Sequence, residues 1–376
     1  MSLVLKNISR VVDGECYINN ATITFEPGSF NVLLGRTLAG KTSLMRLLAG
    51  LDKPSEGRLF MDGVDVTGVA VQKRNIAMVY QQFINYPSLT VFENIASPLR
   101  IAGVAESMIH KKVNEVAAML HIEPFLQRFP LELSGGQQQR TAMARALIKE
   151  GGLILFDEPL VNLDYKLREE LRFELRELFK VKNTIAIYAS TEPSEALALG
   201  GVTSLLHEGR IIQSGPVNEV YNLPDSIEAA ELFSEPPINI IKTKVAKEQV
   251  YIGNSDGFSL SKLPAPLPVG DYNIGIRPHH ITLTQCHDDD IAIEAKVDVA
   301  EISGSETYLH VANEYLTMVI QLSGIHVFHT DTRLRVYLPV NKLYVFDHAG
   351  KRVLAPQYLS TQNDRAHNSK RDTHHG

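Results

Sequence analysis

The sequence predicts an α/β fold built on a parallel sheet, with a helical subdomain inserted into it and a small all-β barrel after it. Three observations predict this arrangement. Strands alternate with helices between residues 1 and 235, helical periodicity fills about 90–150, and short alternating strands without helices occupy 240–355. Strand–helix alternation is typical of parallel sheets, and closely spaced short strands favour a barrel.

The first region, residues 1–235, is predicted to form one domain. A glycine-rich turn separates the apolar run Phe30 to Leu34 from a helix predicted over Thr42 to Ala49, because the leucines of that segment fall on one helical face. Later in the domain, two apolar strands flank an amphipathic helix that is rich in charge; the strands are 152–156 and 184–189, and the helix is 164–180. The order of these elements predicts that the strands lie parallel in one sheet.

The pattern changes after Glu235-Pro236-Pro237. Residues 240–355 contain short alternating strands separated by turn signals, which predict a second, smaller domain of the barrel type. Residues 356–376 are polar, with few large apolar side chains, and we expect them to form a disordered tail. A chain of 376 residues is long enough for two such domains.

Composition narrows the class of protein. The net charge of -6 gives no electrostatic reason to expect nucleic acid as a partner. Only Cys16 and Cys286 are present, in different predicted domains, which favours a reducing cytoplasm over a disulfide framework. No apolar stretch approaches the roughly 20 residues that would span a bilayer. If the protein serves transport, other chains must provide the pore.

The first chemical motif is a phosphate loop of the pattern G-x-x-x-x-G-K-[ST]. Backbone N–H groups of such a loop point inward around phosphate oxygens, and the dipole of the following helix favours an anion. Lys41 is expected to reach the terminal phosphates, and the Thr42 hydroxyl is expected to ligate Mg²⁺. The predicted nucleotide-binding residues are Gly35, Arg36, Thr37, Leu38, Ala39, Gly40, Lys41, Thr42 and Ser43.

The second motif is an apolar strand that ends in two carboxylates, Asp157 and Glu158. Asp157 is expected to hold Mg²⁺ through water, and Glu158 is expected to polarise the attacking water. A strand followed by an acid is common in proteins. Its place 115 residues after Thr42, with helices between, makes it specific.

The third motif is Leu133-Ser134-Gly135-Gly136-Gln137, at the predicted start of a helix. A serine and two glycines at a helix N-terminus form an anion site that a phosphate can approach closely. The expected binding residues are Ser134, Gly135, Gly136 and Gln137. Together with the phosphate loop and the Asp-Glu pair, this motif resembles the signature of the ABC ATPase family, and the resemblance covers residues 1–235.

The resemblance implies a two-lobed domain that dimerises head to tail around two ATP molecules with Mg²⁺. Each ATP lies between the phosphate loop of one subunit and the signature of the other. Gln81 matches the glutamine that senses Mg²⁺, with Gln82 as the alternative register, and Asn162-Leu163-Asp164 matches the D-loop. Two positions depart from the family. Val12 stands where an aromatic residue usually stacks on adenine, and Tyr17 is a possible replacement; Thr191 stands where a histidine usually contacts the γ-phosphate.

The second domain narrows the resemblance to the ATP-binding subunits of carbohydrate importers. Gly275-Ile276-Arg277-Pro278 matches a recurring segment of their OB-like regulatory domain. The run VYQQFINYPSLTVFENIASPLR resembles their loop for docking membrane subunits, and its apolar residues Phe83, Tyr86, Leu89 and Phe92 are expected to form the docking surface beside Gln81. The segments GRTLAGKTSLMRLLAGLD and ASTEPSEALALGG are similar to one ATP-binding subunit of the bacterial glycerol importer. This similarity implies a heterodimer with a second, non-identical ATPase, two transmembrane permease subunits and, indirectly, a periplasmic substrate-binding protein.

These resemblances place the chain at the cytoplasmic face of the bacterial inner membrane as a peripheral subunit that energises uptake of a small polyol or sugar, with glycerol first. Two alternatives stay open. The cargo is another carbohydrate or glycerol-3-phosphate, or the chain is a catalytically silent structural partner of an active ATPase, as Thr191 suggests. Lys41, Asp157 and Glu158 favour the active enzyme.

Overall fold

The computed structural model describes residues 1–356 apart from 83, 150, 162, 182–183 and 253–256. The chain forms two compact units, Met1–Val220 and Tyr221–Gly376. The division precedes the junction expected at 235–240. The reason is local: the buried guanidinium of Arg277 binds the backbone carbonyls of Tyr221 and Phe233, so the segment between them packs with the second unit. The tail expected over 356–376 lies outside the described residues, except for residue 356.

The first unit contains an antiparallel sheet at its N-terminus. Its strands follow the order β2-β1-β4-β5. Leu3 pairs with Phe25 on one side and with Met61 on the other, so the apolar residues of β1 face the interior. The bounds are β1 Leu3–Val12, β2 Glu15–Phe25, β4 Glu56–Met61 and β5 Val64–Asp65.

A six-stranded sheet forms the centre of the same unit, in the order β10-β9-β3-β8-β7-β6. Strands β9, β3, β8, β7 and β6 are parallel, and β10 is antiparallel to β9. Every residue of β7 and β8 is buried, as expected for parallel strands covered on both faces. The bounds are β3 Phe30–Leu34, β6 Ile76–Val79, β7 Leu153–Asp157, β8 Ile185–Ser190, β9 Val202–His207 and β10 Arg210–Pro216.

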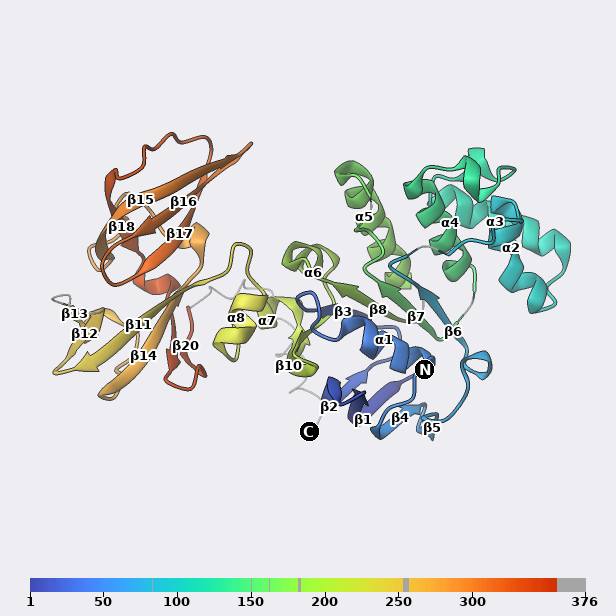
Figure 1. Cartoon of the computed structure of the whole chain (residues 1–376), viewed down its shortest axis with the longest axis horizontal. Helices are drawn as coiled ribbons and strands as arrows, with labels where there is room; N and C mark the ends of the chain where they lie inside the picture. Colours follow the sequence, from blue (N-terminus) through green and yellow to red (C-terminus); the bar gives the residue numbers. More distant parts are fainter. Residues whose placement is uncertain (83, 150, 162, 182–183, 253–256, 357–376) are drawn as a thin grey trace, which may run out of the picture. The chain divides into compact units, whose positions relative to one another are not determined.

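Helices surround this sheet and also form a separate lobe, which Figure 1 shows beyond β6. The lobe contains α2, α3 and α4, and α2 begins with a capping box between Thr90 and Glu93. The helical subdomain that the sequence predicts is therefore present, with its helices between Val91 and Leu147. The bounds are α1 Lys41–Ala49, α2 Val91–Ile101, α3 Glu106–Met119, α4 Gly135–Leu147, α5 Tyr165–Val181, α6 Pro193–Leu199 and α7 Val217–Asn222. Among the described helices, none combines the length and apolar composition needed to span a membrane.

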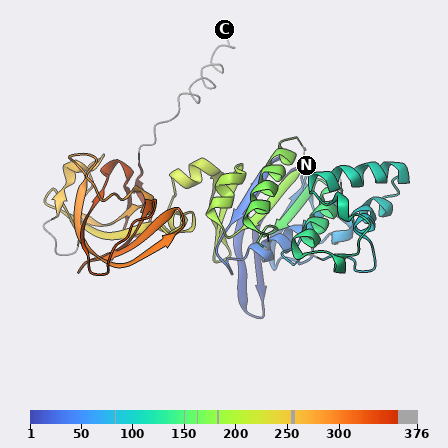
Figure 2. The same ribbon diagram turned by 90° about the horizontal axis from the view of Figure 1, so that it is seen from above.

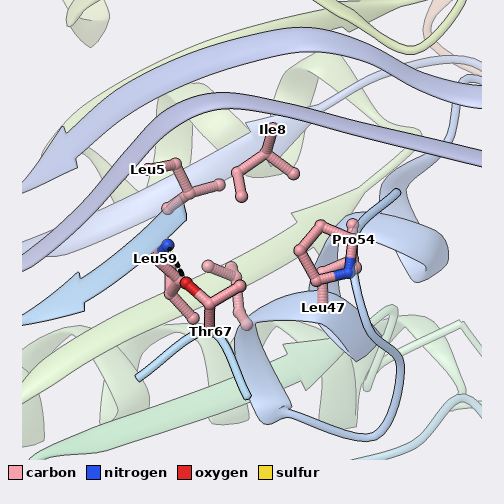
Figure 3. A pocket seen from close by; sticks show the side chains of 7 residues that line it. Leu5, Ile8, Leu47, Pro54, Leu59 and Thr67 are labelled. Atoms are coloured by element: carbon pink, nitrogen blue, oxygen red, sulfur yellow. Dashed lines mark hydrogen bonds between the residues drawn. The ribbon is translucent and has the colours of Figure 1, made fainter. Parts of the chain in front are cut away.

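A small cavity of about 10 Å³ lies between β1, β4 and α1. Figure 3 shows that its lining is apolar apart from Thr67, whose hydroxyl accepts a hydrogen bond from the Leu59 N–H at 2.9 Å. A space of this size holds at most about one water molecule, and an apolar lining gives that water few partners. We therefore treat it as a packing void in the core. Its lining residues are Leu5, Ile8, Leu47, Leu48, Pro54, Leu59 and Thr67.

The second unit is formed almost entirely by antiparallel strands, in the orders β13-β12-β11-β14-β19-β20 and β17-β16-β15-β18. Residues from both sheets share one apolar core, and Figure 2 shows the strands curving around a common interior, as a barrel-like domain requires. The bounds are α8 Ile227–Leu232, β11 Asn239–Ala246, β12 Gln249–Ile252, β13 Phe258–Ser259, β14 Gly270–Ile276, β15 Ile291–Ser303, β16 Glu306–Ala312, β17 Thr317–Ser323, β18 Arg333–Leu338, β19 Tyr344–Asp347 and β20 Arg352–Leu354. Short 3-10 helices occupy Val71–Lys73, Glu123–Phe125, Pro130–Glu132, Leu260–Lys262, Pro278–His280 and Val340–Lys342.

Candidate nucleotide site

The predicted phosphate loop connects the carboxyl end of β3 to the start of α1. Two of its glycines are required by close approach. A Cβ on Gly35 would lie 2.7 Å from the Leu206 carbonyl oxygen, and one on Gly40 would lie 2.6 Å from the Tyr17 carbonyl oxygen. Gly40 also has a φ of 102°, a conformation that L side chains rarely adopt. The loop is thus wrapped tightly, with its following amides at the N-terminus of α1.

Lys41 lies across this loop. Its Nζ donates hydrogen bonds to the carbonyl oxygens of Gly35 at 2.8 Å and Arg36 at 3.0 Å, and it lies 3.2 Å from Glu158 Oε1. The side chain is only 4% exposed. A buried ammonium held by carbonyls and one carboxylate can exchange the carboxylate for a phosphate, which carries more negative charge.

The two carboxylates at the end of β7 lie beside the loop. Asp157 is 3% exposed and accepts a hydrogen bond from the Thr42 hydroxyl at 3.2 Å. Burial raises the pKa of Asp157, and the charge of Glu158 raises it further, although Thr42 and Lys41 act in the opposite direction. A desolvated carboxylate next to a second one and a hydroxyl oxygen is the oxygen donor set that Mg²⁺ prefers, so these residues fit the expected ion.

Gln81 and Glu158 meet at the same end of the sheet. Gln81 Nε2 donates to Glu158 Oε2 at 3.3 Å, and this contact favours Gln81 over Gln82 as the family glutamine. Glu158 has a φ of 48°, unusual for a residue with a side chain. Its backbone N–H donates to the Ala189 carbonyl at 3.2 Å, which stabilises this strained conformation. The carboxylate is therefore held in a defined position over Lys41.

Thr191 directly follows β8, and the end of this strand lies beside the phosphate loop. The Ser190 carbonyl accepts a hydrogen bond from the Gly35 N–H at 3.1 Å. The end of β8 is supported by a buried carboxylate, because the hydroxyls of Ser190 and Tyr188 both donate to Glu195 Oε2, at 2.6 and 3.2 Å. The expected position of Thr191, beside the phosphate loop, is consistent with these contacts.

Tyr17 lies at the start of β2 with its backbone against Gly40, and its side chain is 43% exposed. The phenol donates to Glu15 Oε2 at 3.1 Å, and that contact raises the pKa of Tyr17. Val12, the last residue of β1, pairs with Glu15 across the turn. Tyr17 therefore presents an accessible ring near the loop, and its contact with adenine stays a prediction.

The signature residues form the start of α4, in the helical lobe. The Ser134 hydroxyl accepts from the Gln137 N–H at 3.4 Å, and Gln137 Oε1 accepts from the Ser134 N–H at 2.9 Å. This reciprocal capping box explains why the helix begins here. Figure 1 separates α4 from α1, with the sheet strands between them. The chain therefore does not bring its own signature to its own phosphate loop.

Comparison with known proteins gives the family of the chain. Residues 18–161 match the family described as ABC transporter. The sn-glycerol-3-phosphate import ATP-binding protein UgpC of Paraburkholderia xenovorans is 32% identical over 359 residues, covering 93% of this chain and 99% of the relative. A protein of the same name from Agrobacterium fabrum is 34% identical over 355 residues, with 93% and 99% covered. The chain belongs to the ATP-binding subunits of ABC importers.

The relatives of this ABC transporter ATPase differ in the cargo that their names give. The Fe(3+) ions import ATP-binding protein FbpC of Escherichia coli O157:H7 is 38% identical over 281 residues, covering 74% of this chain and 79% of the relative. An enzyme of this family binds ATP and couples its hydrolysis to transport, and these features are common to the relatives. The ATP site is therefore established at the level of the family, while the cargo is not.

Solved structures show the same core fold. The dimeric post-hydrolysis form of the ATP-binding cassette MJ0796, bound to ADP and Pi, has a TM-score of 0.52 and 27% identity. A dimeric structure of MJ0796 described as a bacterial ABC transporter cassette has a TM-score of 0.54 and 26% identity. Each covers 57% of this chain and 98% of the solved chain, so the second unit lies beyond the shared fold.

Sequence reasoning missed one residue that links two predicted segments of the ABC transporter ATPase. Arg168, on α5, lies 2.9 Å from Glu192, the residue after Thr191, and it also donates to the carbonyls of Val161 and Leu163 at 3.5 and 3.4 Å. It therefore connects the Thr191 segment to the predicted D-loop, of which Asn162 lies outside the described residues. An arginine four positions after Asp164 was the only local signal.

The apolar residues expected to dock membrane subunits separate into two groups. Tyr86 is 47% exposed, whereas Phe92 is 9% exposed in the buried face of α2; Ile84, which was not among the expected residues, is 55% exposed. The inclusion of Phe92 in the docking surface was wrong, because its side chain is buried in α2 and its ring packs against the His110 ring of α3, 4.7 Å between centroids. Leu89 is half-buried. Phe83, also expected there, lies outside the described residues.

Proposed function

We propose that this chain energises uptake of a small polyol, with glycerol the first candidate, as one ATPase of a heterodimer. The observation that carries the catalytic part is the convergence of Lys41, Thr42, Asp157 and Glu158 at one edge of the central sheet. The glycerol part is supported by the similarity of the loop and of the segment around Thr191 to one subunit of a glycerol importer. Another carbohydrate or glycerol-3-phosphate is the alternative cargo.

In this proposal the loop amides of 35–43 and Lys41 hold the phosphates of ATP. Thr42 and Asp157 would hold Mg²⁺, with Gln81 nearby, and a bound ion would supply positive charge to the phosphates. Glu158 orients and polarises water from the position that Gln81 and Ala189 give it. ATP displaces Glu158 from Lys41, because a phosphate competes for the same ammonium.

The dimer places the signature of this chain on the ATP of the other ATPase. Ser134 and Gly136 lie at the N-terminus of α4, where free backbone N–H groups favour an anion. The site on this chain contains Thr191 in place of an imidazole. Threonine is shorter and cannot become a cation, so it is a poor substitute for the γ-phosphate contact. A non-identical partner that keeps the histidine would supply one fully equipped site.

The membrane-spanning subunits are proposed to dock beside Gln81, on the exposed segment that contains Ile84 and Tyr86. This segment is held to α4, because Asn85 Nδ2 donates to the Gln138 carbonyl at 2.8 Å and the Arg145 guanidinium lies 4.7 Å from the Tyr86 ring. The contact could transmit movement of the docked subunit to the signature helix. The chain would then lie at the cytoplasmic face of the inner membrane without crossing it.

The test is reconstitution with the membrane subunits and purification of the assembled complex. We expect two distinct ATPase chains in it and uptake of labelled glycerol that requires ATP. A functional importer with two copies of this chain would refute the heterodimer. Uptake of glycerol-3-phosphate but not of glycerol would show that glycerol-3-phosphate, and not glycerol, is the cargo. If Lys41→Ala and Glu158→Gln both left ATPase activity and uptake unchanged, the chain would be a silent structural partner.

A further inference from the structure

A polar hollow of about 400 Å³ is lined by residues of β11, β12 and β14 in the six-stranded sheet of the second unit, together with His348. It is far larger than the packing void of the first unit, and its volume is in the range of small-molecule sites. The strand register explains its composition. Lys242 pairs with Asn273, and Lys244 pairs with both Asp271 and Tyr251. The lining residues are Lys242, Thr243, Lys244, Tyr251, Asp271, Tyr272, Asn273 and His348.

The hollow begins at the point on the sheet where packing against α8 ends. Side chains alternate along β11, so Ile240, Lys242 and Lys244 share one face, opposite the core residues of the same strand, and Ile238, just before the strand, continues this alternation. At one end of this face, Ile238 and Ile240 pack with Ala230 of α8 and with aromatic residues of β19. At the other end, both lysines are exposed. The sequence thus changes from apolar to cationic where the covering helix no longer protects the sheet.

The two lysines have no internal partner for their charge. Neither ammonium group forms a hydrogen bond or ion pair with any residue that the structure describes, although Asp271 lies directly opposite Lys244 in the strand register. Because the two lysines are two residues apart on one face of a strand, their Cβ atoms lie about 7 Å apart. Ammonium groups on flexible stems at this spacing can converge on a single anion and relieve their mutual repulsion.

We propose that this hollow binds a phosphate monoester of a small polyhydroxy compound. Lys242 and Lys244 contact the phosphate. The Asp271 carboxylate accepts hydrogen bonds from ligand hydroxyls, and so does the Asn273 amide oxygen, whose amide nitrogen already donates to the Asp347 carbonyl at 3.3 Å. The Tyr251 ring provides an apolar wall, since it is half-buried.

The Asp271 carboxylate makes the hollow selective for such a monoester over inorganic phosphate. Asp271 repels the negative charge of inorganic phosphate, whose P–OH donors lie on the charged group itself, whereas the hydroxyls of a polyhydroxy ligand supply neutral donors away from the phosphate. The site therefore favours a molecule that combines both chemistries. It belongs to the second unit, so it is separate from the phosphate loop, and it does not depend on the cargo proposed above.

The test uses the full chain, saturated with ATP so that the phosphate loop is occupied. Calorimetric titration with glycerol 3-phosphate is expected to show saturable binding, with inorganic phosphate at least tenfold weaker and glycerol without measurable binding. Vesicles containing phosphatidylglycerol are the arm for a lipid headgroup, and no binding to them is expected. Equal affinity for inorganic phosphate, binding to vesicles alone, or no binding of the monoester would each overturn the proposal.

Two variants and a control locate the site. Lys242→Ala and Lys244→Ala remove exposed side chains, so both should fold, and each is expected to weaken binding about tenfold or more, as loss of a charge-assisted contact does. Lys296→Ala is the control, because Lys296 is exposed on β15 of the same unit, lies outside the lining of the hollow, and forms an ion pair at 3.8 Å with the exposed carboxylate of Asp331. Undiminished binding in both pocket variants, or an equal loss in Lys296→Ala, would refute the assignment.

Discussion

Arg277 is the most buried charge of the second unit, and its replacement tests how that unit holds its first segment. The side chain is 0% exposed. Its guanidinium donates to the carbonyls of Phe233 at 2.9 Å and Tyr221 at 2.6 Å, and its central carbon lies 3.8 Å from the Tyr221 ring centroid. Arg277→Met keeps an unbranched apolar chain of similar reach but leaves both carbonyls without their donor.

The magnitude follows from these contacts. Each buried carbonyl left without a partner costs about 1–3 kcal/mol. The cation–π contact adds about 2 kcal/mol, and removal of a buried charge offsets part of the sum. We expect Arg277→Met to lower the free energy of unfolding of the second unit by about 3 kcal/mol. Arg335→Met is the control, since Arg335 pairs with Glu294 on the surface, and such pairs contribute about 0–1 kcal/mol.

The assay is native-state hydrogen exchange in the full chain, resolved by peptide. It is needed because the chain contains no tryptophan to report on one unit by fluorescence, and because two units need not unfold together. Peptides from β11, β14 and the 221–233 segment should lose protection in Arg277→Met, whereas those from the first unit should not. If the amides of these peptides were no less protected from exchange in Arg277→Met than in Arg335→Met, the proposed role of Arg277 in holding the 221–233 segment would be wrong.

Three further outcomes are expected. Burial raises the pKa of Asp157 above its unfolded value, so the stability that its protonated form contributes is present below about pH 4 and is lost as the pH rises through the folded pKa. Asp157→Asn should therefore be more stable than the parent at pH 7–8 without Mg²⁺, but it should lose the Mg²⁺-dependent thermal shift with ATP. A variant less stable than the parent would contradict this. Thr191→His should leave transport nearly unchanged, and a large gain in ATPase activity would show that its site sets the rate. Tyr17→Ala should weaken ATP binding about tenfold in a titration while Val12→Ala does not, and equal effects would remove Tyr17 from the adenine site.

Local sequence patterns were sufficient for the parts of the site that are continuous in the chain. The phosphate loop, the Asp157–Glu158 pair and the capped signature helix each depend on neighbouring residues. A parallel sheet places strand ends at one edge, so their convergence could also be expected. The proposed head-to-tail dimer cannot be recovered in this way, because in that proposal the phosphate that Ser134 contacts would be bound to another chain.

Contacts between distant segments were beyond the sequence. Arg168 meets Glu192 across 24 residues, and Arg277 binds a carbonyl 56 residues earlier. Nothing in the local pattern distinguishes these arginines from solvated ones. Phe92 illustrates the opposite error, since an apolar residue in a run with exposed ones was assigned to a surface although it packs in the lobe. Burial of a single side chain depends on tertiary packing. The periodicity of apolar residues predicts which face of an element is buried, but not whether each side chain on it is buried.

The central claim is that the signature of this chain serves a competent ATP site on its partner, whereas Glu158 acts in an altered one. The direct measurement is ATPase activity of the assembled complex carrying either Gly136→Asp or Glu158→Gln. An aspartate near the start of α4 is favourable for the helix but places a negative charge where a phosphate should bind. Gly136→Asp should lower the rate about 10²–10³-fold and Glu158→Gln much less. Abolished turnover in Glu158→Gln together with full activity in Gly136→Asp would contradict the account.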